Sequence, residues 1–315
     1  MGDDEAPGAS GGVEGVAGVG PGGRPLPRAR LQVGRGPERG PPLLPDERMK
    51  AMRLSLSGFL FEDRYISQSV TFPAFCGIAK SCGYDGVELR GTQVRPESPA
   101  HERGEILRIA QDNGLPITCL TARGLPASGP ERDAFFHSYL DLCRDLGCHL
   151  LKIGSDTAWL HDAAEKAKDH GVTLATNNHV GGVLETVAGT RRTFTEISHS
   201  NFGLLYDALH LSVTGEDYLG CIPEFAGITR NLLIHSAREA RPNEKVTLEK
   251  NGRRWTSPCL PDEPGVQDWP AVFRAFKQLN YDGLITVIEN GWPGDQREHV
   301  ARRCAEIIRQ LWDEA

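Results

Sequence analysis

The chain has 315 residues, of which 39% are hydrophobic and 24% are charged, so it is long enough to bury a complete core. Its net charge of −7 argues against nucleic acid as a partner, because binding to a phosphate backbone usually leaves a basic footprint. No apolar run approaches the roughly 20 residues that span a bilayer, which excludes an integral membrane protein. A small neutral substrate, or one coordinated locally, fits this composition better.

The eight cysteines are scattered along the chain without a Cys-x-x-Cys pair, and most lie in apolar stretches such as residues 74–82. This pattern indicates reduced core thiols rather than zinc ligands or a disulfide framework. We therefore expect a reducing, cytoplasmic setting.

Residues 1–48 are dominated by Gly, Pro, Arg, Ala and acidic residues, with almost no aromatic side chains. Such a segment cannot bury enough apolar surface to offset the entropy lost on ordering, so we expect a disordered tail. It lacks the continuous apolar segment of a secretory signal, and a transit peptide would be poorer in acidic residues. Met49 or Met52 is an alternative translation start, which the N-terminal peptide of the native protein would test.

From Met52 onward, eight short apolar runs alternate with eight amphipathic segments, which is the pattern of repeated β–α units around a parallel sheet. The predicted strands are residues 53–59, 86–90, 116–121, 149–154, 173–179, 203–211, 231–235 and 284–287. The predicted helices are residues 72–82, 101–113, 130–146, 158–170, 182–197, 218–228, 269–279 and 295–313. Eight units over about 260 residues predict an α/β fold, a single (β/α)₈ TIM barrel covering residues 49–315. The alternative, an open doubly wound sheet, lacks support because no Gly-rich phosphate loop follows the first strand.

The stretch from Asn201 to Leu211 reads as a buried strand that ends on an acidic residue and a histidine. Parallel α/β folds place their chemistry at the C-terminal ends of strands, so Asp207 and His210 are candidate site residues. The alternative is that Asp207 is a turn residue and His210 a solvated loop histidine.

Several further motifs lie on the predicted units: FPAFC at 72–76, GYDGVELR at 83–90, GVTLA at 171–175, DWPAV at 268–272 and YDG at 281–283. Together with Asp207, His210 and His235, they resemble the xylose isomerase-like TIM-barrel superfamily over nearly everything from Met52 to the C-terminus. That superfamily includes sugar phosphate isomerases and epimerases, ketose 3-epimerases, hydroxypyruvate isomerases, inosose and 3-dehydroshikimate dehydratases, subunits of C-glycoside deglycosidases, and endonuclease IV. The motifs are specific for the superfamily and weak for any one activity.

The resemblance implies a divalent metal held at the C-terminal mouth of the barrel by residues that follow strands 5 to 8. Asp207, His235 and Glu289 match three of these positions. Oxygen and nitrogen ligands of this kind suit Mn²⁺, which we expect, with Mg²⁺, Co²⁺ or Zn²⁺ as alternatives. Each residue also has a purely structural interpretation: Asp207 as a helix cap, His235 as a core histidine, and Glu289 as the partner of an arginine.

The family's glutamate after strand 5 is replaced here by Asn177. An amide oxygen can coordinate a hard cation, but it brings no charge and cannot act as a base at neutral pH. His179 lies two residues on and faces the same side of the strand, where it either completes the coordination or orients a ligand. The segment from Asp282 to Glu289 is one residue longer than is usual in the family, which predicts a bulge or a shifted register.

The resemblance also implies residues that contact the substrate. His210 resembles the histidine that ketose epimerases place against a substrate hydroxyl, and Arg241 matches a substrate-contacting arginine, with Arg238 as an alternative. Glu88 and Arg90 end strand 2 facing the same mouth, unless they form an internal ion pair. The long insert of residues 240–267 is expected to lie over the mouth as a lid.

The function that the resemblance implies is a metal-dependent carbohydrate isomerase or epimerase, acting next to a carbonyl through a metal-stabilised enediolate. The family's epimerases use two metal-bound glutamates, whereas Asn177 leaves one strong base, Glu289 or a histidine. The alternatives are a lyase or dehydratase, an enzyme that cleaves C-glycosides of keto-sugars, and a non-catalytic sugar-binding barrel. The expected partner is a small carbohydrate, with no nucleic acid and no membrane, and a homo-oligomer is compatible with the sequence.

Overall fold

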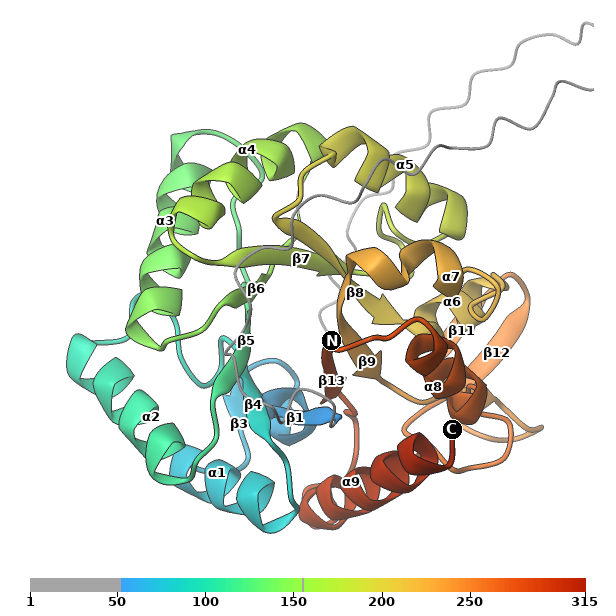
Figure 1. Cartoon of the computed structure of the whole chain (residues 1–315). Coiled ribbons are helices and arrows are strands. Elements are labelled where there is room, and N and C mark those ends of the chain that lie inside the picture. The colour runs from blue at the N-terminus through green and yellow to red at the C-terminus, as the bar shows by residue number, and fades with distance from the viewer. Residues whose placement is uncertain (1–51, 155) are drawn as a thin grey trace, which may run out of the picture. The chain divides into compact units, whose positions relative to one another are not determined.

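The computed structural model describes residues 52–154 and 156–315, so the predicted tail of residues 1–48 lies outside the described residues. Eight parallel strands form the barrel: β1 Arg53–Ser57, β4 Gly86–Leu89, β5 Ile117–Thr121, β6 Leu150–Lys152, β7 Thr173–Asn177, β8 Phe202–Asp207, β9 Thr229–Ile234 and β13 Leu284–Val287. They close in the order β1-β13-β9-β8-β7-β6-β5-β4 (Figure 1). The predicted (β/α)₈ barrel is therefore confirmed, and the open sheet is excluded.

The helices surround this barrel in Figure 1. They are α1 Phe72–Ser81, α2 Ala100–Asp112, α3 Pro130–Asp145, α4 Thr157–Asp169, α5 Val187–Ile197, α6 Ala208–Thr214, α7 Ile222–Phe225, α8 Trp269–Gln278 and α9 Arg297–Glu314. Short polar side chains start several of them, as where Asp268 accepts a hydrogen bond from the Ala271 N–H at 3.0 Å. The helix predicted for residues 218–228 is reduced to α7 and a 3₁₀ turn, Ala226–Ile228.

The strand predicted for residues 203–211 is too long, because it ends at Asp207 and residues 208–214 form α6. The cause is Asp207 itself, whose Oδ1 accepts the His210 N–H at 3.3 Å and so caps the helix. Gly215, with φ of +84°, closes α6 in the left-handed conformation that favours glycine. His210 therefore projects from the first turn of a helix and not from a strand.

The insert of residues 240–267 contributes to a small antiparallel sheet of β10 Arg238–Glu239, β12 Arg253–Thr256 and β11 Leu248–Lys250. Trp255, which is 3% exposed, packs with Leu209 and Val213 of α6. Figure 1 shows β11 and β12 beside α6, not across the centre of the barrel. The part of the insert that forms β11 and β12 thus lies next to α6, and a lid over the mouth stays a prediction.

All eight cysteines lie within the described residues and are free thiols, seven of them buried and Cys82 half-buried. The prediction of core thiols is therefore confirmed. In the part of the chain that the structure describes, no helix has the length and apolar character needed to cross a membrane.

Candidate active site

The polar lining of the barrel mouth follows from strand alternation. The barrel interior contains an apolar layer formed by Cys119, Leu150, Ala175, Leu205, Leu233 and Ile288. Two positions further along five of these strands, on the same face, lie Thr121, Lys152, Asn177, Asp207 and His235. These polar residues therefore lie at the C-terminal mouth, which is where parallel barrels place their sites.

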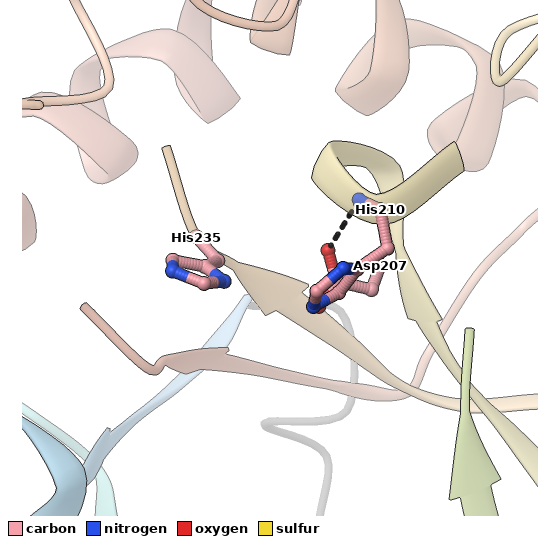
Figure 2. A group of neighbouring side chains, drawn as sticks. All are labelled: Asp207, His210 and His235. Carbon is pink, nitrogen blue, oxygen red and sulfur yellow. Dashed lines mark hydrogen bonds and ion pairs between the residues drawn. The ribbon is translucent and has the colours of Figure 1, made fainter. Parts of the chain in front are cut away.

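Asp207, His210 and His235 meet in this mouth (Figure 2). Each offers one ligand atom, and the three atoms lie within 4.8 Å of one another. Nε2 of His210 is 3.7 Å from Oδ2 of Asp207, and the rings of His210 and His235 have centroids 5.8 Å apart. The structure thus brings together two of the predicted metal ligands and the histidine that was predicted to contact substrate.

Two buried atoms of this group lack a hydrogen-bond partner among the described residues, namely Oδ2 of Asp207 and Nδ1 of His235. Leaving a polar atom buried and unpaired costs about 1–3 kcal/mol. The other carboxylate oxygen of Asp207 is occupied by the helix cap, so Oδ2 is the oxygen left for a ligand. A divalent cation fits this donor set, because a carboxylate oxygen and imidazole nitrogens are its usual protein ligands.

The protonation states also suit a cation. Burial lowers the pKa of His235 to about 4, against the opposing effect of Asp207. Burial, followed by the charges of His179 and Lys152, lowers the pKa of His210 to about 3. Both imidazoles are therefore neutral at pH 7 and have a nitrogen lone pair to donate. Burial raises the pKa of Asp207, while the charge of His235 and the His210 N–H oppose the rise.

Asn177 and His179 lie at the edge of this group. The Asn177 amide nitrogen donates to the Asn178 carbonyl at 2.8 Å, which leaves its amide oxygen as the atom for coordination. The His179 ring packs on that of His210 with centroids 4.1 Å apart, and its Nδ1 lies 2.7 Å from the Val180 carbonyl oxygen. Coordination by Asn177 and His179 stays a prediction.

Glu289 lies outside the group of three ligand atoms. It is fully buried, its Oε1 accepts the Ser236 N–H at 2.9 Å, and its Oε2 has no hydrogen-bond partner among the described residues. It follows the interior residue Ile288 by one position, whereas Asp207 and His235 follow theirs by two. Burial raises its pKa well above 4.5, and the hydrogen bonds with Ser236 oppose that rise. Its roles as metal ligand and base stay predictions.

Glu88 and Arg90 do not form the ion pair with each other that the sequence allowed. Oε1 of Glu88 accepts hydrogen bonds from Ser57 at 3.0 Å and Thr121 at 3.1 Å, while its buried Oε2 has no partner among the described residues. Arg90 instead pairs with Glu62, at 3.1 Å. A contact of Glu88 or Arg90 with substrate stays a prediction.

The arginines predicted to contact substrate lie in the insert. Arg241 is exposed, and within the described residues its guanidinium forms no ion pair. Its backbone N–H donates to Glu244 at 2.7 Å, and the same carboxylate pairs with Arg238. Arg241 is not among the residues grouped around Asp207. A contact between Arg241 and substrate stays a prediction.

Sequence reasoning missed two charged residues of the mouth. Lys152 ends β6, and its positive charge contributes to the low pKa values of His210 and His235. The sequence signal that could have identified Lys152 is its position two residues after the interior residue Leu150, on the same face of the strand. Glu62 belongs to a hairpin of two-residue strands, β2 Glu62–Asp63 and β3 Ser67–Gln68, too short to leave a periodic pattern.

Comparisons with known proteins found a matching family model and several similar proteins. A family model described as the xylose isomerase-like TIM barrel matches residues 76–311. An inosose dehydratase of Lacticaseibacillus casei is 24% identical over 135 residues, which cover 41% of this chain and 44% of that protein. The match therefore spans less than half the length of this curated relative.

Solved structures of several other proteins share the fold. The probable 3-DHS dehydratase AsbF of Bacillus anthracis has a TM-score of 0.64 at 14% identity, covering 82% of this chain and 98% of that one. An L-ribulose 3-epimerase has a TM-score of 0.62 at 17% identity, covering 84% and 95%. A xylose isomerase-like TIM barrel protein from Mycobacterium smegmatis, solved in complex with magnesium, has a TM-score of 0.64 at 13% identity, covering 84% and 98%. At these identities the likeness shows the fold.

Proposed function

The chain belongs to the xylose isomerase-like TIM barrel family, and from this premise we propose that it is a divalent-metal-dependent enzyme acting next to a carbonyl of a sugar or sugar derivative. The observation that carries the proposal is the group of Asp207, His210 and His235, whose ligand atoms lie within 4.8 Å of one another at the barrel mouth. Within this family, an isomerase or epimerase is the first candidate function that we propose.

Asp207, His210 and His235 would hold the cation, with Asn177 as a neutral fourth ligand. The unpaired Oδ2 of Asp207 and Nδ1 of His235 support this assignment. We propose Mn²⁺, with Mg²⁺, Co²⁺ and Zn²⁺ as alternatives, because a mixed set of oxygen and imidazole ligands suits all four. A cation bound there would act as a Lewis acid that polarises a substrate carbonyl.

Glu289 is the proposed base. Its Oε2 has no partner among the described residues, and the Ser236 N–H fixes its other oxygen at 2.9 Å. Burial raises its pKa, which brings its affinity for a proton closer to what abstraction from carbon requires at neutral pH. The carboxylate would take the proton next to the carbonyl, and the electron pair left on carbon would move toward the carbonyl oxygen. In an isomerase the same carboxyl would return the proton to the former carbonyl carbon, while the hydroxyl proton on the carbon that was deprotonated would move to the former carbonyl oxygen.

A lyase that removes water is the second candidate, and Asn177 is the observation that favours it. Epimerisation by two bases needs a proton-exchanging group on each face of the substrate, and an amide cannot serve as one. Loss of water needs one base, which returns the proton it has taken to the departing hydroxyl. The similarity to an inosose dehydratase supports this candidate.

Metal content and products test the proposal together. Anaerobically purified protein is expected to contain a divalent cation at close to one ion per chain. Ketoses, inososes and 3-keto-glycosides are then screened with added Mn²⁺ or Co²⁺. A product of unchanged mass identifies an isomerase or epimerase, and a product lacking one water identifies the lyase. Only a trace of metal, with no turnover of any substrate, would instead favour a non-catalytic sugar-binding barrel.

Asn177→Glu is expected to raise the affinity for Mn²⁺ by about tenfold or more, because a carboxylate adds a charged oxygen beside Asp207. Calorimetric titration of the metal-free protein with Mn²⁺ measures the change. Gln111→Glu, the same amide-to-carboxylate exchange at an exposed position of α2, is the matched control and should leave the affinity unchanged. If Asn177→Glu alters neither metal affinity nor turnover, Asn177 does not contact the metal.

A further inference from the structure

A pocket of about 200 Å³ opens on the wall of the barrel mouth, and it is lined by Glu62, Tyr65, Arg90, Gly91, Thr121, Ala122 and Arg123. Its walls are the ends of β4 and β5 and the tip of the hairpin formed by β2 and β3. In the closed order of strands, β4 and β5 stand across the barrel from β8 and β9 (Figure 1). The pocket and the group around Asp207 therefore lie on opposite sides of one mouth.

The hairpin wall of the pocket is fixed in place. Arg297, which is 7% exposed, donates to Asp63 of β2 at 2.5 Å and to Ser69, the residue after β3, at 2.8 Å. The Tyr65 ring at the tip packs on Phe59 with centroids 5.4 Å apart. These contacts hold Tyr65 at the pocket without a ligand, so little ordering is left to oppose binding.

The pocket carries one positive charge in excess, because two guanidinium groups face one carboxylate. Glu62 neutralises Arg90 through contacts of 3.1 and 3.3 Å and also accepts from Thr92 at 2.7 Å. Arg123 is exposed and lies over the Tyr65 ring, 5.3 Å from its centroid, and also donates to the Tyr65 carbonyl. Among the described residues Arg123 has no acidic partner. Its charge is therefore the one available to an anion.

We propose that this pocket binds a carboxylate of the substrate, which makes the substrate a sugar acid or a related polyhydroxy carboxylate. The planar guanidinium of Arg123 matches a carboxylate, and one excess charge matches one negative charge. A phosphate monoester carries about −1.5 to −2 at pH 7, so it would exceed that charge and face Glu62. The pocket is smaller than the roughly 300 Å³ at which drug-sized sites begin, as a small substrate requires.

Thr121 connects the pocket with the centre of the mouth. It lines the pocket and donates to Oε1 of Glu88, whose Oε2 remains without a partner among the described residues. A substrate held by its carboxylate at Arg123 would pass Glu88, which can accept a hydrogen bond from a substrate hydroxyl, on the way to Asp207. The inference deepens the proposed function and rests on it for the reacting end of the substrate.

Calorimetric titration with D-glucuronate, D-glucose 6-phosphate and D-glucose tests the inference, because the three probes differ at one carbon. EDTA is present throughout, so that a carboxylate cannot bind through a metal. The full chain is expected to bind glucuronate at least tenfold more tightly than either other probe, as a charged hydrogen bond would provide. The inference is overturned if glucose 6-phosphate binds more tightly than glucuronate. It is also overturned if all three probes bind with equal affinity, or if none of them binds.

Two variants and one control locate the binding. Arg123→Gln should abolish the preference for glucuronate, whereas Arg192→Gln, an equal loss of charge at an exposed position of α5, should retain it. Glu62→Gln raises the excess charge to two and should move the preference toward the phosphate. If Arg123→Gln still prefers glucuronate, the pocket is not the carboxylate site. The binding measurement needs neither metal nor turnover. Failure of the carboxylate inference can therefore be distinguished from failure of the proposed function.

Discussion

Asp207→Asn is expected to weaken Mn²⁺ binding by at least about 100-fold and to reduce turnover to background. Losing a group that only orients a metal ligand already costs about 10- to 100-fold in affinity, so losing the charge of a ligand should cost more. Asp207 would contribute the only carboxylate among the three grouped ligand atoms. Calorimetry on metal-free protein measures the affinity, and metal analysis of the purified variant measures what it retains.

The asparagine variant is chosen because it preserves the fold. Oδ1 of Asp207 caps α6 through the His210 N–H, and asparagine caps a helix about as well as aspartate does. The thermal midpoint of unfolding should therefore change little, and the loss of metal cannot be ascribed to unfolding. Asp313→Asn removes the same charge from an exposed residue of α9 and should bind Mn²⁺ normally. Wild-type Mn²⁺ affinity in Asp207→Asn would remove the proposed metal site.

The barrel could be predicted because each unit carries a local signal, a short apolar run followed by an amphipathic segment. The same signal misplaced the end of β8, since residues 208–211 are as apolar as the strand before them. What ends the strand is the helix cap made by Asp207. Asp207 therefore caps a helix, which is one of the alternatives that the sequence left open, and its other carboxylate oxygen is the one proposed to bind the metal. His210 joins the grouped ligand atoms because the cap places it on a helix.

The remaining parts of the mouth depend on contacts between distant segments, which leave no local pattern. Arg297 reaches Asp63, 234 positions away in the sequence, and so fixes the hairpin wall of the pocket. The contact between the guanidinium of Arg123 and the ring of Tyr65 likewise joins segments that are distant in the sequence. The extra residue before Glu289 predicted a bulge or a shifted register, whereas β13 pairs with β1 and β9 without a break in register. The contact of the Glu289 carboxylate with the Ser236 N–H also joins distant segments.

Glu289→Gln is expected to lower turnover by about 100- to 10,000-fold, the usual contribution of a general base, while stabilising the metal-free protein at neutral pH. Burial raises the pKa of Glu289 above 4.5, so the folded chain keeps a proton that the unfolded chain releases. The contribution of Glu289 to the stability of the wild type should therefore fall by about 1.4 kcal/mol per pH unit as the pH rises from about 4.5 toward the folded-state pKa. Glutamine does not titrate, and its amide oxygen can still accept the Ser236 N–H.

The difference in free energy of unfolding between Glu289→Gln and the wild type should thus grow as the pH rises above about 4.5. Urea unfolding in EDTA measures it, and turnover is measured with the substrate found in the screen. Glu105→Gln, which removes a carboxylate from an exposed position of α2, should alter neither quantity. A pH-independent difference would mean that water reaches the carboxyl and that burial does not control its ionisation. Full turnover in Glu289→Gln would transfer the role of base to a histidine, because the glutamine side chain cannot take up a proton at neutral pH.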